Sequence, residues 1–233
     1  SRSAAMGAVC AGVTAATFYN FNPAMVAKHI PRAWTLASPA EVLAARLRIA
    51  DSALRRLLGE GLGSAELTEL AQLAREATEP LAPEGRPLYA AHATLDWPDE
   101  PHLALWHAAT LLREYRGDGH LAALLRAGLS GIEAIITHTA TGRGFTVESA
   151  KKIRGWSDQQ WDAATEALRS RGLMDADGLS AAGVALRESI EADTDRLDTA
   201  AWRHLGEDRT VRLIELGKRL TRAVVAHGAF PPE

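Results

Sequence analysis

Residues 99–142 read DEPHLALWHAATLLREYRGDGHLAALLRAGLSGIEAIITHTATG and carry the densest group of polar side chains in a chain otherwise rich in alanine and leucine. Pro101 follows two acidic residues that can cap a helix, and apolar residues then recur at spacings of three and four. Gly117 is a natural helix stop, and Ser130 caps a last helix that Gly142 ends. The stretch therefore predicts three short helices joined by glycines.

An antiparallel packing of these helices would gather five chemically capable side chains. They are Arg113, Glu114, Asp118, His120 and His138. A guanidinium, two carboxylates and two imidazoles in one place can bind an anionic or polar ligand, hold a metal ion or move protons. A structural interpretation stays open, in which Arg113 and Asp118 form an ion pair, Asp118 caps a helix and the histidines pack in the core.

The ligand interpretation gives each of these side chains a role. Arg113 would bind an anionic or carbonyl group. His120 and His138 are the acid–base candidates because imidazole titrates near neutrality, and Glu114 and Asp118 would orient them. The further candidate ligand contacts are Tyr19, His107 and Thr110. The sequence contains no HExxH or CxxC motif, so it assigns no metal ligand, and it identifies no cofactor.

Length and composition limit the class of protein. The 233 residues suffice for one large or two small domains, and the scarcity of β-branched and aromatic residues favours helices. No apolar run approaches the roughly 20 residues that cross a bilayer, so no membrane partner is expected. A single cysteine, Cys10, provides no disulfide framework, and a cytoplasmic location is the default. The net charge of −3 is not that of a dedicated nucleic-acid binder.

The chain divides into three predicted parts. Residues 1–98 form an N-terminal helical region, in which the Pro- and Gly-rich segment 79–87 interrupts the helical pattern. Ser38 and Glu41 predict a capping box for a helix at 40–58, and Arg46 is assigned to the solvated side of that helix. Residues 99–142 are the central three-helix stretch with the polar cluster. Residues 143–233 contain a short helix, a longer helix capped by Ser157, a tight turn and two further helices.

The order of elements in the third part resembles a winged helix. The segment EALRSRGLMDADGLSAAGVAL, residues 166–186, is similar to the MarR-type module: a recognition-position helix, a run into the wing and a helix that opens at a Leu-Ser-x-x-Gly step. The resemblance covers residues 146–191, and it implies flanking helices that form a homodimer. The fold class that follows is mostly α, with a multi-helical N-terminal domain and a C-terminal MarR-like winged-helix domain whose wing is minimal.

The chain as a whole resembles a family of actinobacterial proteins described as helix-turn-helix or winged-helix. The matching stretches are ATFYNFNPAMV, PDEPHLALWHAATLLREYRGDGHLAALL, THTATG and RGWSDQQWDAATEALRSRGL. Members of that family carry further helices before the point where this sequence begins. The resemblance therefore implies that part of a ligand pocket is contributed by residues upstream.

Charge argues against DNA as the partner of this module. A DNA-reading winged helix normally has a basic recognition helix and a long wing with an arginine near its tip. Residues 141–183 hold six Lys or Arg and six Asp or Glu, a difference of zero, and the wing position is acidic at Asp175 and Asp177. Because phosphate contacts supply most of the non-specific affinity for DNA, the module is poorly equipped for it.

Three functional interpretations follow. The first is a small-molecule-binding protein on a winged-helix scaffold, with a chemical transformation of the ligand left open. The alternative is a MarR-like, ligand-responsive transcriptional regulator that binds DNA, and the third is a structural module that binds a protein partner. A continuous positive face from Lys151 and Lys152 to Arg169 and Arg171 would favour DNA, whereas a patchwork of charge would not.

Overall fold

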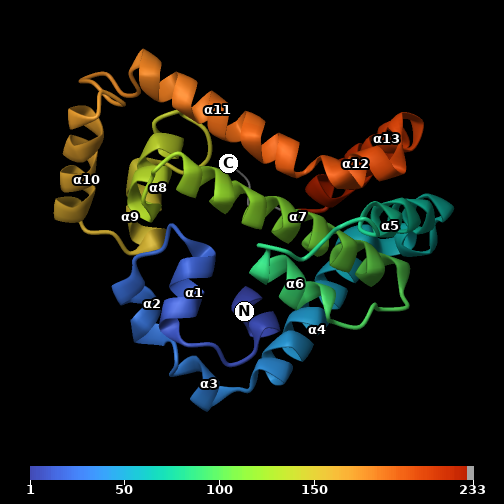
Figure 1. Ribbon diagram of the computed structural model, residues 1–233. Helices are drawn as coiled ribbons and strands as arrows, with labels where there is room; N and C mark the ends of the chain where they lie inside the picture. The colour runs from blue at the N-terminus through green and yellow to red at the C-terminus, as the bar shows by residue number, and fades with distance from the viewer. Residues whose placement is uncertain (230–233) are drawn as a thin grey trace. The chain divides into compact units, whose positions relative to one another are not determined.

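The computed structural model describes residues 1–229, and its regular elements are helices (Figure 1). Within that range there is no strand, and one isolated antiparallel bridge pairs Met174 with Leu179. The prediction of a mostly α protein is confirmed.

The central stretch forms two helices and not the predicted three. Helix α7 (Pro101–Arg126) runs through Gly117 and Gly119 without a break, and α8 (Gly131–Thr139) follows it (Figure 1). A glycine inside a helix costs about 1 kcal/mol relative to alanine. Here the burial of side chains on both sides of the glycines outweighs that cost. Asp118 therefore lies inside a helix and does not cap one.

Contacts group the chain into two compact units, each assembled from segments that are distant in the sequence. The first unit consists of Ser1–Gly7, Ser38–Arg116 and the segment from Asp198 onward. The second unit consists of Ala8–Ala37 and Gly117–Leu197. Helix α7 therefore contributes its first part to one unit and its last part to the other.

The first unit contains seven elements besides the first part of α7. They are η1 (Arg2–Met6), α4 (Pro39–Leu58), η2 (Gly59–Gly63), α5 (Ala65–Ala77), α6 (Pro87–Ala93), α12 (Thr199–Leu205) and α13 (Glu207–Ala226). The predicted capping box at the start of α4 is confirmed, since the Ser38 hydroxyl accepts from the Glu41 N–H and the Glu41 carboxylate accepts from the Ser38 N–H.

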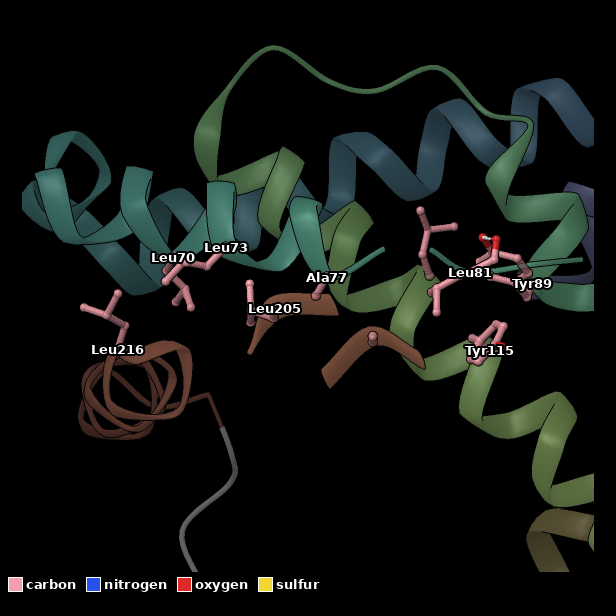
Figure 2. Close-up of a cluster of buried hydrophobic side chains, with 10 residues drawn as sticks. Leu70, Leu73, Ala77, Leu81, Tyr89, Tyr115, Leu205 and Leu216 are labelled. Atoms are coloured by element: carbon pink, nitrogen blue, oxygen red, sulfur yellow. Dashed lines mark hydrogen bonds between the residues drawn. The ribbon is translucent and has the colours of Figure 1, made fainter. Parts of the chain in front are cut away.

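Figure 2 shows the hydrophobic core of the first unit. It joins leucines of α5 and residues of α12 and α13 to the two tyrosines Tyr89 and Tyr115. The tyrosine rings meet edge to face with centroids 5.1 Å apart, and the Tyr89 hydroxyl donates to the Leu81 carbonyl at 2.9 Å. The phenol of Tyr89 is thus satisfied although it is buried.

A row of ion pairs connects α5 to α13. The pairs are Glu66 with Arg219, Glu69 with Arg212, and Glu76 with Arg209. Because the residue numbers rise along α5 as they fall along α13, the two helices run antiparallel. Partly exposed ion pairs contribute only about 0–1 kcal/mol each. They set the direction and register of this helix pair, and the leucines between the helices supply most of its stability.

The second unit contains the last part of α7, α8 and six further helices. They are α1 (Ala11–Phe18), α2 (Pro23–His29), α3 (Ala33–Leu36), α9 (Val147–Arg154), α10 (Asp158–Ser170) and α11 (Ala181–Leu197). The predicted caps at Ser130 and Ser157 are both confirmed as complete capping boxes, and the Thr146 hydroxyl accepts from the Ser149 N–H at the start of α9.

Two glycines allow close backbone approaches in the second unit. A Cβ at Gly131 would lie 2.0 Å from the Tyr19 carbonyl oxygen, and a Cβ at Gly183 would lie 2.0 Å from the Leu173 carbonyl oxygen. Gly183 is the glycine of the Leu-Ser-x-x-Gly step. The Ser180 N–H also donates to the Leu173 carbonyl, at 3.2 Å, so the start of α11 is held against the turn that precedes it.

Among the described residues, no single helix is both long and apolar enough to cross a membrane. The consecutive helices α7 and α8 meet the length and composition criteria only when taken together, and they are bent by 102° at the break between them.

The core of the first unit generates a stability prediction on α13. Leu216 is 2% exposed and Val211, on the same helix, is 50% exposed. We expect Leu216→Ala to lower the free energy of unfolding by about 2–5 kcal/mol, because the truncation leaves a cavity, and Val211→Ala to change it by less than about 0.5 kcal/mol. Urea unfolding followed by circular dichroism measures both, and equal effects would contradict this core.

Candidate functional site

The structure distributes the eight predicted site residues over both units. The first unit holds His107, Thr110, Arg113 and Glu114, and the second holds Tyr19, Asp118, His120 and His138. Each group is therefore described within its own unit.

In the second unit, His120 and Tyr19 form hydrogen bonds to other elements. His120 Nδ1 lies 2.9 Å from Thr194 Oγ1, and the Thr194 hydroxyl donates to the Ile190 carbonyl at 2.7 Å. Thr194 Oγ1 therefore accepts from His120, which places a proton on Nδ1. The Tyr19 hydroxyl donates to the Leu129 carbonyl. Both polar groups thus connect helices of this unit.

His138 lies beside an arginine that is almost fully buried. Burial and, after it, the charge of Arg187 lower the pKa of His138. Arg187 Nη2 donates to Glu191 at 2.9 Å, while its Nε and Nη1 are buried without a partner among the described residues. A Cβ at Gly144 would lie 2.9 Å from His138 Nε2. The imidazole is therefore largely neutral near pH 7 and is covered by the Gly144 loop.

In the first unit, the Glu114 carboxylate accepts hydrogen bonds from two arginines. Its side chain is 1% exposed, and Arg2 binds both carboxylate oxygens, with Nε–Oε1 at 2.8 Å and Nη2–Oε2 at 2.5 Å. Arg113 adds a third hydrogen bond, from Nη1 to Oε1 at 3.0 Å, although its own side chain is 61% exposed. Arg113 therefore pairs with its neighbour in sequence, and the Glu114 oxygens are occupied.

Two of the predicted ligand contacts line a cavity of about 170 Å³ in the first unit. The cavity lies between α4, the end of α6 with the loop that follows it, and α7. Its polar lining residues are Arg46, His92, Asp96, His107 and Thr110, and its apolar ones are Leu43, Ala44, Leu47, Leu95, Pro98 and Trp106. Apolar walls with a few converging polar groups are typical of small-molecule sites.

His107 is a buried polar residue of the cavity lining, and one of its ring nitrogens lacks a partner. It is 3% exposed, its ring meets the Trp97 ring edge to face at 4.7 Å, and its Nε2 has no hydrogen-bond partner in the described part of the chain. Burial, followed by the charges of His92, Arg46 and Arg75, lowers its pKa to about 4. At neutral pH the ring is therefore uncharged, and Nε2 can form one hydrogen bond with a ligand.

Arg46 is held in the cavity wall by an imidazole and an indole. Its Nη1 lies 3.0 Å from His92 Nε2, and its guanidinium lies over the Trp106 ring at 5.0 Å. His92 Nδ1 lies 2.9 Å from the Leu88 carbonyl, which can only accept, so the His92 proton is on Nδ1 and Nε2 accepts from Arg46. Burial lowers the pKa of His92, which agrees with this neutral tautomer.

The sequence interpretation missed Arg46, which it assigned to the solvated side of the helix at 40–58. A signal for it was present, because Arg46 follows Leu43 by three positions and precedes Leu47 by one, which places it beside the apolar stripe of α4. The sequence also gave no reason to connect His92 with His107. In residues 1–229, no group of three or more His, Cys, Asp or Glu side chains is arranged to hold a metal ion.

The model of a helix-turn-helix family matches residues 1–231. The chain belongs to this helix-turn-helix family. No curated protein and no solved structure matches the sequence of this chain significantly. The resemblance to helix-turn-helix proteins is thus confirmed at the level of the family.

A helix-turn-helix protein that reads DNA needs unpaired cations on its DNA-facing helices. In this helix-turn-helix protein, one basic residue of α9 and the arginine of α10 have acidic partners. Lys151 pairs with Asp158 at 2.8 Å, and Arg169 lies 3.5 Å from Glu166. Arg171, next to the end of α10, pairs with Glu133 at 2.8 Å. Carboxylates thus compensate the charges of three of the basic residues in this region.

The low pKa of His107 predicts how stability depends on pH. Because the folded-state pKa is about 4, below the ordinary value of 6.5, the unfolded chain binds this proton first as the pH falls. We expect the free energy of unfolding to decrease as the pH drops from 6.5 toward 4, by up to about 1.4 kcal/mol per pH unit for this proton.

A His107→Phe variant should lose this part of the pH dependence. Urea unfolding at several pH values between about 7 and 5 compares it with the parent protein. Identical slopes in the His107 variant and the parent would contradict the assignment of a buried neutral imidazole.

Proposed function

We propose that this helix-turn-helix protein binds a small organic molecule in the cavity lined by His107 and Arg46. The observation that carries the proposal is His107, which lines the cavity and whose buried Nε2 atom has no hydrogen-bond partner among residues 1–229. An unsatisfied buried polar group costs about 1–3 kcal/mol, and a ligand that bonded to it would recover that energy.

The size of the cavity limits the ligand. A cavity of about 170 Å³ is comparable with an engineered protein cavity of about 150 Å³ that binds benzene. The site therefore accommodates one six-membered ring or a short branched chain, or the head of a longer molecule whose remainder lies outside. Leu43, Leu47 and Trp106 provide the apolar contacts, and Thr110 and His107 provide polar ones, which supports their predicted role as ligand contacts.

The finer parts of the sequence interpretation remain predictions. They are the MarR-like winged-helix module at 143–233 with its minimal wing, the division at residues 98 and 142, the homodimer and the cytoplasmic location. The catalytic roles of Glu114, Asp118, His120 and His138 also remain predictions. We assign no reaction.

A screen of small neutral fragments by ligand-detected NMR tests the proposal. Fragments of one ring with a hydrogen-bonding group should bind, and His107→Leu should weaken their binding about tenfold, because it removes the Nε2 contact. His204→Leu, outside the cavity, should leave it unchanged. Equal binding to both variants would refute the proposed site, and so would a failure of neutral and anionic one-ring fragments alike to bind.

DNA binding by the second unit is a second candidate function, which membership of a helix-turn-helix family favours. The pairing of Lys151, Arg169 and Arg171 with carboxylates predicts few phosphate contacts. We therefore expect the affinity for duplex DNA to change less than about tenfold between about 50 and 200 mM salt.

A DNA-binding titration at these two salt concentrations separates the candidates. A protein with about six to ten phosphate contacts loses about a thousandfold or more in affinity over this range. A loss of this size would favour DNA binding, provided that the double variant Lys151→Gln/Lys152→Gln loses less affinity over the same salt range. A flat response would remove this second candidate.

A further inference from the structure

Arg46 is a half-buried cation without a carboxylate partner. In the part of the chain that the structure describes, its guanidinium contacts the His92 imidazole and the Trp106 ring. Asp96 lines the same cavity but does not form an ion pair with it. Removing a guanidinium from water is unfavourable unless an anion compensates it, and neither an imidazole nor an indole carries a negative charge.

The buried carboxylate that acts on Arg46 already has other partners. Glu114 and Arg46 interact electrostatically, but Arg2 and Arg113 occupy the Glu114 oxygens through hydrogen bonds. Three guanidiniums thus surround one buried carboxylate, and Arg2 and Arg113 each repel the charge of Arg46. The wall of the cavity at Arg46 is therefore electropositive.

The two histidines of the cavity do not compensate the positive charge of Arg46. His92 is neutral and accepts from Arg46 through Nε2, so it leaves the positive charge in place. The Thr110 hydroxyl donates to the Trp106 carbonyl at 2.8 Å, so its proton is already used. His107 Nε2 also has no partner among the described residues, and as the N–H tautomer it would donate. The unused donors are thus Arg46 N–H groups and, in this tautomer, His107 Nε2–H.

We infer that the ligand of this cavity is a small organic anion, a carboxylate on an apolar or aromatic body. The inference rests on the proposed function, because it specifies the ligand of the same site. The carboxylate binds Arg46 and His107 Nε2–H, and the body lies against Leu43, Leu47 and Trp106. A carboxylate fits because it accepts several hydrogen bonds, and charge-assisted bonds to arginine are about twice as strong as neutral ones.

Benzoate and benzamide are matched probes for this inference. They share one ring and nearly one shape, and they differ in charge. We expect the parent protein to bind benzoate at least about tenfold more tightly than benzamide, because only benzoate compensates the Arg46 charge. Isothermal titration calorimetry gives the two affinities, and quenching of tryptophan fluorescence provides a second readout because Trp106 lines the cavity.

Substitution of Arg46 assigns the selectivity to this residue. Arg46→Gln should weaken benzoate binding by about tenfold or more and change benzamide binding less than about threefold. Arg48→Gln on the exposed face of α4 is the matched control and should bind benzoate as the parent does. If Arg46→Gln does not fold, the ratio of benzoate to benzamide affinity in the parent protein still decides the question.

The outcomes separate this inference from the proposed function. If benzamide binds as tightly as benzoate, or if neutral fragments bind at His107 while benzoate does not, the ligand is not an anion and the proposed function stands. If the His107→Leu variant and the parent fail to bind every fragment and benzoate, both proposals are refuted. Preferential binding of benzoate that depends on Arg46 supports both.

Discussion

Helix α7 buries ionisable or hydroxyl side chains on nearly every turn of its first part, and the elements around it provide their partners. His102 Nε2 lies 2.6 Å from Asp51 of α4, and Glu114 is bound by Arg2 of η1. Thr110 donates to the backbone of its own helix. A buried charge without a partner costs several kcal/mol, so α4 and η1 are positioned by these contacts as well as by apolar packing. His107 is the exception, and the cavity lies beside it.

Burial and charge together fix the protonation states of this site. Two imidazoles close to Arg46 are neutral because a positive charge and the loss of water both oppose a second cation. The same two effects act on Arg46, whose pKa is lowered by burial, yet a guanidinium keeps its proton in proteins. The histidines can therefore relieve the unfavourable charge by losing protons, and Arg46 cannot. This difference is why the unsatisfied charge of the site is located on Arg46.

The sequence predicted the local signals well and the long-range pairing poorly. The caps at Ser38, Ser130 and Ser157 follow from residue types three positions apart, and all are present. The break predicted at Gly117 is wrong because a glycine's preference of about 1 kcal/mol is smaller than the energy of burying a helix face. His107 and Thr110 lie three positions apart on one helix, but Arg46 and His92 join them only through tertiary packing, which no spacing in the sequence encodes.

The helix-turn-helix family is defined by an arrangement of helices, and that arrangement alone does not determine function. Affinity for DNA depends on how many basic side chains are free to contact phosphates. In the second unit, carboxylates of α8 and α10 take up the charges of Arg171 and Lys151. If either residue contacted a DNA phosphate, the new ion pair would replace an existing one. The net gain in binding free energy per contact would therefore be small. In the first unit Arg46 has no carboxylate partner, because Arg2 and Arg113 occupy the Glu114 oxygens. An uncompensated positive charge thus lies in the wall of a cavity of about 170 Å³, where a small anion fits and a duplex does not.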